Sequence, residues 1–434
     1  MQTNNLFYQK YTYDRSNFEF FYKIDDFEFS VKTNLTKDIT IPIYLKEIIV
    51  KNIGMVYLLD FAEIVLPKNI VLHPSVSNEE LYYWKYWHKE IARERIYIDR
   101  LPTKLLDINW INNNQSLPSK PLEIINNDKS AIICTTGGKE SLSSLYLLKD
   151  DLNLTILSLD PKNNPHRSNA IDKLSITFPV LTAETTRIDV IKMLSKKYNG
   201  SQPSGFDMGH LIFYSLLYSD QNKNVLIGNE YGANLPNTYY EGYPINHQYV
   251  KSFDLAKTIN QYIHTYITPN FNYNSPFFGF YEYKIAEYFF SLNEYLPLWT
   301  SCNNFTKEKR FCGKCAKCAS SFLLGLLYKD KDFLKNYFEY YLLNDLSLYK
   351  DLLSFTSIKP LDCIGDKKEV WVALYEIYSS GKDTSSDTIK FFLKEIYPSI
   401  KDELPLFKKE ILSWQNTNLF NDTLIFKAVK EKML

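Results

Sequence analysis

Eight consecutive residues, Cys134-Thr-Thr-Gly-Gly-Lys-Glu-Ser141, have the composition of a phosphate-binding loop. They lie between an apolar run and a segment with helical periodicity, where an α/β fold directs backbone N–H groups and a helix N-terminus toward an anion. The glycines would let the main chain approach phosphate, the lysine would offset its charge, and the hydroxyls would donate to its oxygens. The eight-residue Walker spacing is absent, and an ordinary tight turn is the alternative. The predicted phosphate-binding residues are Thr136, Gly137, Gly138, Lys139, Glu140 and Ser141.

Four of the six cysteines lie within 17 residues, in the pattern C-x9-C-x2-C-x2-C, and are Cys302, Cys312, Cys315 and Cys318. This spacing suits tetrahedral zinc, and four protein ligands leave no open position, so we predict a structural metal. An iron–sulfur cluster or unligated thiols are the alternatives. The isolated cysteines, Cys134 and Cys363, are expected to be buried thiols, with a substrate-pocket role as the alternative for Cys363.

Composition excludes several classes of protein. The chain has 434 residues, 45% of them hydrophobic, which is room for about three domains with real cores. Lysine plus arginine (50) cancels aspartate plus glutamate (50), so there is no global basic field to hold nucleic acid. The N-terminus lacks an apolar signal core, and no stretch approaches the roughly 20 apolar residues of a membrane span. We therefore predict a cytoplasmic protein for which nucleic acid is not the expected partner, with a local basic groove as the alternative.

The helices and strands that must position these motifs follow different sequence patterns before and after about residue 125. Two period-2 runs around Asp25-Asp26 predict a β-hairpin, a helix is expected over 43–61, and Asn78 is expected to cap a second helix. The polar stretch 112–121 has the composition of a linker. We predict an N-terminal α+β domain over residues 1–125.

Beyond the linker, short apolar strands alternate with helices, which is typical of a doubly wound, parallel α/β sheet. The segments 130–135, 155–159, 178–181 and 224–228 are the expected strands. We predict an α/β domain that carries the glycine loop over 126–300, the cysteine knuckle over 301–330, and a helical C-terminal region over 331–434.

The glycine loop resembles the S-G-G-x-D-S loop of the PP-loop pyrophosphatases, which cleave ATP to AMP and pyrophosphate. Thr136 replaces the usual serine and Glu140 replaces the usual aspartate, so the carboxylate lies one methylene further out. A PP-loop followed by a four-cysteine knuckle also resembles the 7-cyano-7-deazaguanine synthases, in these two motifs alone.

Further blocks resemble, in order, the landmarks of the UDP-N-acetylmuramoyl-L-alanyl-L-glutamate epimerases. They are Ile227-Gly-Asn-Glu-Tyr-Gly-Ala-Asn-Leu, Ile245-Asn-His-Gln-Tyr-Val-Lys-Ser252, Thr300-Ser-Cys-Asn-Asn-Phe, Cys315-Ala-Lys-Cys-Ala-Ser-Ser-Phe-Leu-Leu and Lys359-Pro-Leu-Asp-Cys-Ile-Gly-Asp366. The resemblance implies ATP-dependent inversion of the terminal L-glutamate of a peptidoglycan precursor to D-glutamate, with release of AMP and pyrophosphate.

That reaction explains why an isomerase would carry an ATP loop. Removing the Cα proton beside a carboxylate places negative charge next to negative charge, whereas an acyl-adenylate stabilises the enolate, and water then frees the inverted acid. A base must reach Cα from a water-poor pocket. His247, Tyr249 and Lys251 are the titratable candidates within the second block, and Glu230 in the first block would bind magnesium or a substrate amine.

Other polar residues allow two interpretations each. Asp160, after the second predicted strand, would bind the adenosine ribose or only cap the strand. His166 and Arg167 would contact ATP, because their loop lies at the carboxyl edge of the sheet. His247 and Lys251 are also consistent with a structural histidine and a surface charge.

Three functions compete. The first is the ATP-dependent epimerase, with Mg²⁺ and structural zinc. The second is a deazaguanine-type ligase or a base or protein modifier, including those of defence systems. The third is a nucleotide-binding scaffold without turnover, suggested by Glu140 in place of aspartate.

Overall fold

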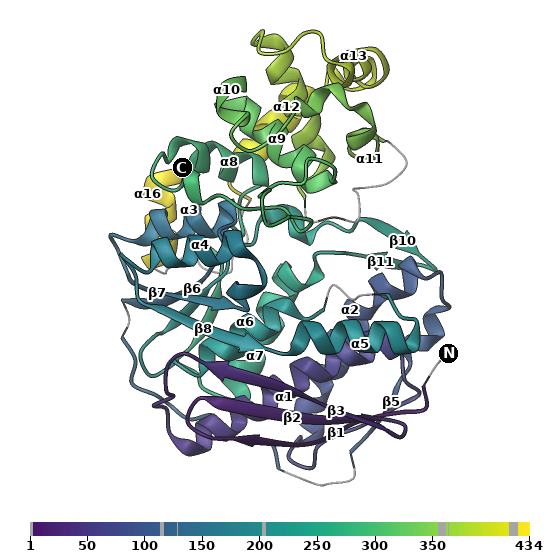
Figure 1. Ribbon diagram of the computed structural model, residues 1–434, viewed down its shortest axis with the longest axis vertical. Coiled ribbons are helices and arrows are strands. Elements are labelled where there is room, and N and C mark those ends of the chain that lie inside the picture. Colours follow the sequence, from purple (N-terminus) through teal and green to yellow (C-terminus); the bar gives the residue numbers. More distant parts are fainter. Residues whose placement is uncertain are drawn as a thin grey trace.

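The computed structural model describes residues 3–112, 117–127, 129–201, 205–354, 362, 364–415 and 424–434. Figure 1 shows a sheet with covering helices in the lower part of the molecule and a helical lobe above it. The strands are β1 (Asn5–Tyr13), β2 (Asn17–Ile24), β3 (Phe27–Leu35), β4 (Asn69–Val71), β5 (Asn109–Ile111), β6 (Ser130–Cys134), β7 (Asn153–Leu159), β8 (Val180–Thr185), β9 (Asn224–Leu226), β10 (Thr238–Tyr240), β11 (Tyr243–Ile245) and β12 (Asn272–Asn274).

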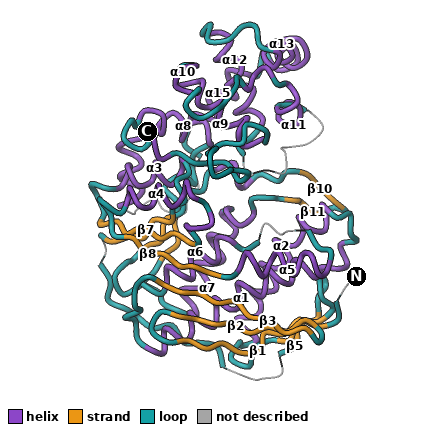
Figure 2. The backbone as a smooth tube through the Cα atoms, viewed as in Figure 1, coloured by secondary structure: helices purple, strands orange, loops and turns teal. Residues whose placement is uncertain are grey.

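Ten strands form one mixed sheet in the order β12-β9-β6-β7-β8-β3-β2-β1-β4-β5, and β10 and β11 form a separate two-stranded ribbon. Neighbours from β12 to β8 are parallel, as are β1, β4 and β5. The predicted mixed α/β architecture with a largely parallel sheet is confirmed, and the orange strands of Figure 2 show its extent.

The predicted hairpin is β2 and β3, which pair in antiparallel register from Asn17–Asn34 to Ile24–Phe27. Every second residue of β2 is buried, as its period-2 sequence requires. The sequence did not predict that β3 also pairs antiparallel with β8. Strands from before and after the predicted boundary at residue 125 therefore belong to one sheet. The four predicted domain ranges stay a prediction.

The helices cover both faces of this sheet and build the lobe above it (Figure 1). They are α1 (Ile43–Val65), α2 (Asn78–Ile98), α3 (Lys139–Leu148), α4 (Pro165–Leu174), α5 (Arg187–Tyr198), α6 (Asp207–Leu216), α7 (Phe253–Tyr266), α8 (Glu282–Ser291), α9 (Ala316–Tyr328), α10 (Lys331–Leu334), α11 (Lys350–Leu353), α12 (Lys367–Ser379), α13 (Asp387–Phe391), α14 (Tyr397–Ile400), α15 (Leu404–Leu412) and α16 (Leu424–Met433). The cap of α2 is Ser77 rather than the predicted Asn78, because Ser77 and Glu80 form a capping box.

The strand β6 separates two hydrophobic cores. Ile132 and Cys134 face the core formed with α1, α2, α6 and α7, whereas Ala131 and Ile133 face the core formed with α3, α4, α8 and α9. All five residues of β6 are buried, because a central parallel strand is covered on both faces. This burial fixes the end of β6, where the glycine loop begins.

The described part of residues 331–434 contains helices and no strand. The last helix, α16, returns to pack against α3, where the Lys432 ammonium donates to the Leu147 carbonyl (2.6 Å) and pairs with Asp151. None of the described helices has the length and apolar character needed to cross a bilayer.

Candidate functional site

The glycine loop connects the end of β6 to the first turn of α3. Gly137 has a left-handed backbone (φ +82°), and Gly138 is the N-cap of α3. The Thr135 hydroxyl accepts from the Gly137 N–H (3.1 Å) and hydrogen-bonds the Ser141 hydroxyl (2.7 Å). The Ser141 hydroxyl, in the first turn of α3, is therefore hydrogen-bonded within the loop.

Thr300 holds the loop from outside. Its N–H donates to the Gly137 carbonyl (2.8 Å) and its hydroxyl donates to the Thr136 carbonyl (2.9 Å). These two bonds satisfy the carbonyls of Thr136 and Gly137, which would otherwise repel an anion at the loop.

We expect Gly137→Ala to lower the melting temperature by about 4 °C, because a left-handed alanine costs about 1–2 kcal/mol and its Cβ would lie 2.9 Å from Thr300 Oγ1. Gly138→Ala is the matched control, since its Cβ meets no atom closer than 3.5 Å and its φ is −69°. Equal melting temperatures for the two variants would contradict this role of Gly137.

A buried charge cluster lies beside the loop. The Lys139 ammonium pairs with Glu140 and with Glu282 of α8 (2.5 Å), and the Lys139 side chain is 6% exposed. Burial opposes its charge, but the two carboxylates raise the pKa of Lys139 above its ordinary value. Burial alone would raise the pKa of Glu140, but the charges of Lys139 and Lys251 lower it. Burial raises the pKa of Glu282, aided by Glu140 and Glu230.

A polar cavity of about 170 Å³ opens in front of this cluster. It is lined by the following residues from across the chain: Thr136, Gly138, Lys139, Glu140, Arg167, Glu230, Lys251, Glu282, Thr300, Ser301, Cys302, Asn303, Lys317, Ser320, Ser321 and Ile364. The structure thus brings together six of the predicted catalytic and ATP-binding residues, Thr136, Gly138, Lys139, Glu140, Glu230 and Lys251, and one predicted metal ligand, Cys302.

Glu230 reaches the cavity from the segment after β9. Gly228 lets this segment pass against α3, because a Cβ at Gly228 would lie 2.7 Å from the Glu140 Cβ. Glu230 is 4% exposed and accepts from the Gln248 amide (2.8 Å), which joins the two sequence blocks. Lys251, at the end of a short 3-10 helix (Tyr249–Lys251), also lines the cavity.

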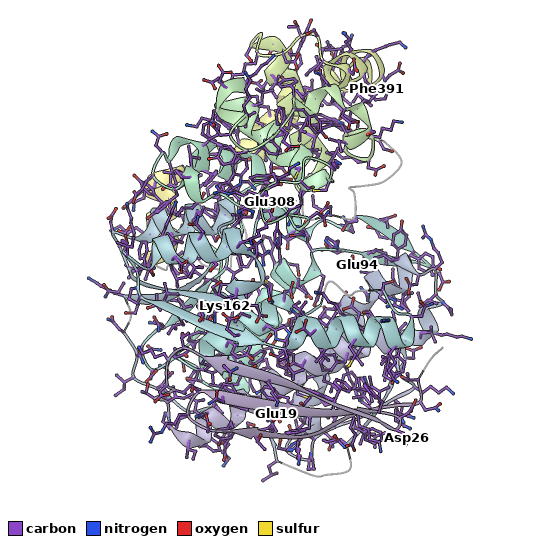
Figure 3. The ribbon with its side chains drawn as sticks, in the orientation of Figure 1. Glu19, Asp26, Glu94, Lys162, Glu308 and Phe391 are labelled. Atoms are coloured by element: carbon purple, nitrogen blue, oxygen red, sulfur yellow. The ribbon has the colours of Figure 1, made fainter. Side chains whose placement is uncertain are left out.

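His247 and Tyr249 lie outside the lining of this cavity. The His247 imidazole hydrogen-bonds Glu94 of α2 through Nδ1 (2.6 Å), and Glu94 is labelled in Figure 3. The Tyr249 hydroxyl donates to Asp254 (2.7 Å), and burial followed by the Asp254 charge raises the pKa of Tyr249 far above its ordinary value. Tyr249 therefore keeps its proton near neutral pH, and both catalytic roles stay predictions.

Asp160 also lies outside the lining. Its carboxylate accepts from the Thr185 N–H (2.5 Å) and the Thr185 hydroxyl (2.8 Å), which ties the end of β7 to the end of β8. These hydrogen bonds give Asp160 a structural role at the edge of the sheet. Its contact with the adenosine ribose stays a prediction.

The predicted cysteine cluster is assembled. The four sulfur atoms of Cys302, Cys312, Cys315 and Cys318 lie within 4.8 Å of one another. The Cys312 sulfur is 3.5 Å from that of Cys315 and 3.7 Å from that of Cys318, close to the edge of about 3.8 Å of a tetrahedron with 2.3 Å metal–sulfur bonds. The sulfurs therefore fit a tetrahedral metal, and Cys315 is also the N-cap of α9.

The other cysteines are separate from this cluster. Cys134 is buried, and burial raises its pKa to about 12, as expected of an inert thiol. Cys363 lies outside the described residues, as do Lys359, Pro360 and Leu361 of the same sequence block.

Glu282 is one of the cavity residues that the sequence did not predict. It lies 143 positions from Lys139 in a helix whose sequence carries no motif. A glutamate at the start of an aromatic-rich helix is a common arrangement, so the sequence gives no reason to select it. Only the ion pair with Lys139 in the folded chain identifies Glu282 as a site residue.

Comparison with known protein families identifies the family of this chain. A family model described as the MurL N-terminal domain matches residues 1–276, which is more than half of the chain, and one described as the MurL C-terminal domain matches residues 298–404. The chain belongs to the MurL family. The resemblance inferred from the ordered sequence blocks is thereby confirmed, and both the glycine loop and the cysteine cluster lie within the matched regions.

Three relatives share the name UDP-N-acetyl-alpha-D-muramoyl-L-alanyl-L-glutamate epimerase. The protein of Xanthomonas oryzae pv. oryzae is 28% identical over 39% of this chain and 39% of its own length. The Micromonospora sp. protein is 27% identical over 58% of each chain, and that of Salinispora tropica is 29% identical over 55% of this chain and 53% of its own. The chain thus spans about half the length of the curated relatives it matches.

Proposed function

We propose that this protein is an ATP-dependent epimerase that inverts the terminal L-glutamate of UDP-N-acetylmuramoyl-L-alanyl-L-glutamate. The observation that carries the proposal is one cavity containing a PP-loop-like glycine loop together with Glu230 and Lys251, in a chain of the MurL family. The names of the relatives supply the substrate. We infer that the enzyme acts in the cytoplasm, where ATP is available.

In the first step, a carboxylate oxygen of the glutamate attacks the α-phosphorus of ATP, an acyl–O–P bond forms and pyrophosphate leaves. Gly138 and the first turn of α3 would bind the phosphates through backbone N–H groups, and Lys139 would offset their charge. Mg²⁺ would neutralise phosphate charge, and Glu140 and Glu282 offer the oxygen ligands it prefers. The Glu282 Oε2 atom is buried without a hydrogen-bond partner among the described residues, which fits such a role.

In the second step, the Cα proton of the acyl-adenylate is removed and returned to the opposite face. Inversion needs an acceptor on one side of Cα and a donor on the other. Glu230 and Lys251 are the best-placed candidates, because both line the cavity in front of the loop. Water then cleaves the acyl–phosphate bond, which releases AMP and the D-glutamyl product.

We expect Glu230→Gln and Lys251→Met each to lower the yield of D-glutamate per AMP about 100-fold, because removing a proton-transfer group costs at least that factor. Activation of the carboxylate continues in both variants, so AMP still forms. Lys257→Met, an exposed position on α7, is the control with unchanged yield. An unchanged yield in both cavity variants would exclude these residues and direct attention to His247 and Tyr249.

We further propose that the cysteine cluster binds structural zinc. Four thiolates complete a tetrahedron and leave no position for substrate or water. Zinc would then fix the start of α9 against the cavity through Cys315 and Cys318.

The proposal is tested by incubating the protein with ATP, Mg²⁺ and UDP-N-acetylmuramoyl-L-alanyl-L-glutamate. AMP and the configuration of the glutamate, determined after hydrolysis by chiral chromatography, are followed together. We expect AMP and D-glutamate to accumulate in parallel. AMP formation without inversion would favour a ligase of the deazaguanine type, and the absence of both products would favour a scaffold.

A further inference from the structure

Two cations in the cavity wall are not engaged by the phosphate loop. Arg167 lies in the first turn of α4 and Lys317 in the first turn of α9, and both line the cavity. Within the described residues, neither side chain forms an ion pair or a hydrogen bond. Lys139, by contrast, already forms ion pairs with Glu140 and Glu282. The cavity therefore offers positive charge beyond the loop.

The side chain of Arg167 is partly buried. Burial lowers the pKa of Arg167, and the charge of Asp207 opposes this shift only in part. The Asp207 carboxylate is itself paired with Arg187 (2.8 Å). A desolvated cation without its own carboxylate costs free energy, and an anionic ligand in the cavity would offset that cost.

The start of α9 adds polar donors at the same place. No side-chain cap hydrogen bond is formed at the start of this helix, where the positive end of its dipole lies. Ser320 and Ser321, one turn further along, also line the cavity. Lys317 lies between two residues of the cysteine cluster, Cys315 and Cys318, so the cluster determines where this end of the helix lies.

We propose that Arg167 and Lys317, with Ser320 and Ser321, bind the side-chain carboxylate of the acceptor's terminal glutamate. This assignment rests on the proposed function, in which the acceptor carries two carboxylates. The carboxylate that attacks ATP must remain free of a cation that would quench its nucleophilicity. Holding the other carboxylate in the wall orients the acceptor and selects an acidic side chain.

To test the assignment, two acceptors are compared in the wild type and in variants of Arg167 and Lys317. The acceptors end in L-glutamate or in L-glutamine, which has nearly the same shape but no charge. For the wild type we expect kcat/KM for AMP formation to be at least about 100-fold higher with glutamate, because a charged group left unpaired in a buried site is rejected by such factors. In Arg167→Met and Lys317→Met we expect this ratio to fall below about 10, through loss of the rate with glutamate.

Three controls accompany the variants. Lys162→Met removes a lysine that is 77% exposed, lies near Arg167 in the sequence and is labelled in Figure 3, and it should leave the ratio unchanged. ATP affinity, measured by calorimetry, should change less than about 3-fold in both cavity variants. The metal content of Lys317→Met should equal that of the wild type.

The outcomes separate this assignment from the proposed function. A loss of ATP affinity with an unchanged glutamate-to-glutamine ratio would show that the two cations bind phosphate, and would overturn the assignment. If the variants do not fold, equal kcat/KM values for the two acceptors in the wild type overturn it. ATP turnover with an unaltered ratio in the variants rejects only this assignment, whereas no AMP with either acceptor rejects the proposed function and this assignment with it.

Discussion

Gly138→Val should lower the affinity for ATP at least about 1,000-fold while the protein remains folded. Gly138 lines the cavity, and a Cβ added there would lie 3.5 Å from Glu140 Oε2 and 3.9 Å from Ser141 Oγ and the Thr300 carbonyl. A side chain therefore has space in the loop itself but occupies the place where phosphate must approach. Losing two charge-assisted N–H bonds costs about 4 kcal/mol, which is about a thousandfold in Kd.

Isothermal titration calorimetry with ATP and Mg²⁺ measures this effect. Gly138→Ala, with the smaller side chain, should weaken binding less, and both variants should melt within a few degrees of the wild type. Wild-type ATP affinity in a folded Gly138→Val protein would place the nucleotide elsewhere.

The second large effect concerns stability. Cys315→Ser should lower the melting temperature by about 10 °C, because a structural zinc site contributes several kcal/mol to folding. Cys302 and Cys318 belong to the same hydrophobic core as Phe311. Loss of the metal would therefore also loosen the packing of this core around the start of α9. Thermal melting with and without a chelator, together with elemental analysis, measures this. We expect one zinc per chain in the wild type.

Cys134→Ala is the matched control, because Cys134 is a buried thiol outside the cluster. It should retain its metal and lose only about 1 kcal/mol of stability. Iron with a visible absorption band would identify a cluster instead of zinc, and an unchanged melting temperature in Cys315→Ser would exclude a structural metal.

The parts of the fold that were predicted correctly are encoded in patterns within short segments of sequence. The hairpin of β2 and β3 is encoded in two adjacent alternating runs, and the glycine loop in an apolar strand followed directly by a helix. The four cysteines were recognisable because three of them share a single short segment. In each case the partners are close in sequence, so spacing alone constrains their geometry.

Contacts between distant segments were not predictable in this way. Thr300 reaches the loop from 164 positions away, and β3 pairs with β8 across about 150 residues. The block around His247 shows the same limit. Its spacing cannot reveal that Glu94, 153 positions away, binds the imidazole while Lys251 of the same block lines the cavity.

Incorporation of deuterium from solvent tests the central claim most directly. The protein is incubated in deuterated water with UDP-N-acetylmuramoyl-L-alanyl-L-glutamate, with and without ATP and Mg²⁺, and the glutamate is analysed by mass spectrometry and chiral chromatography. We expect deuterium at Cα of the D-glutamate product, and only when ATP is present, because the Cα proton becomes acidic only in the acyl-adenylate. Label that appears at Cα without ATP, or D-glutamate that forms without label, would contradict the mechanism.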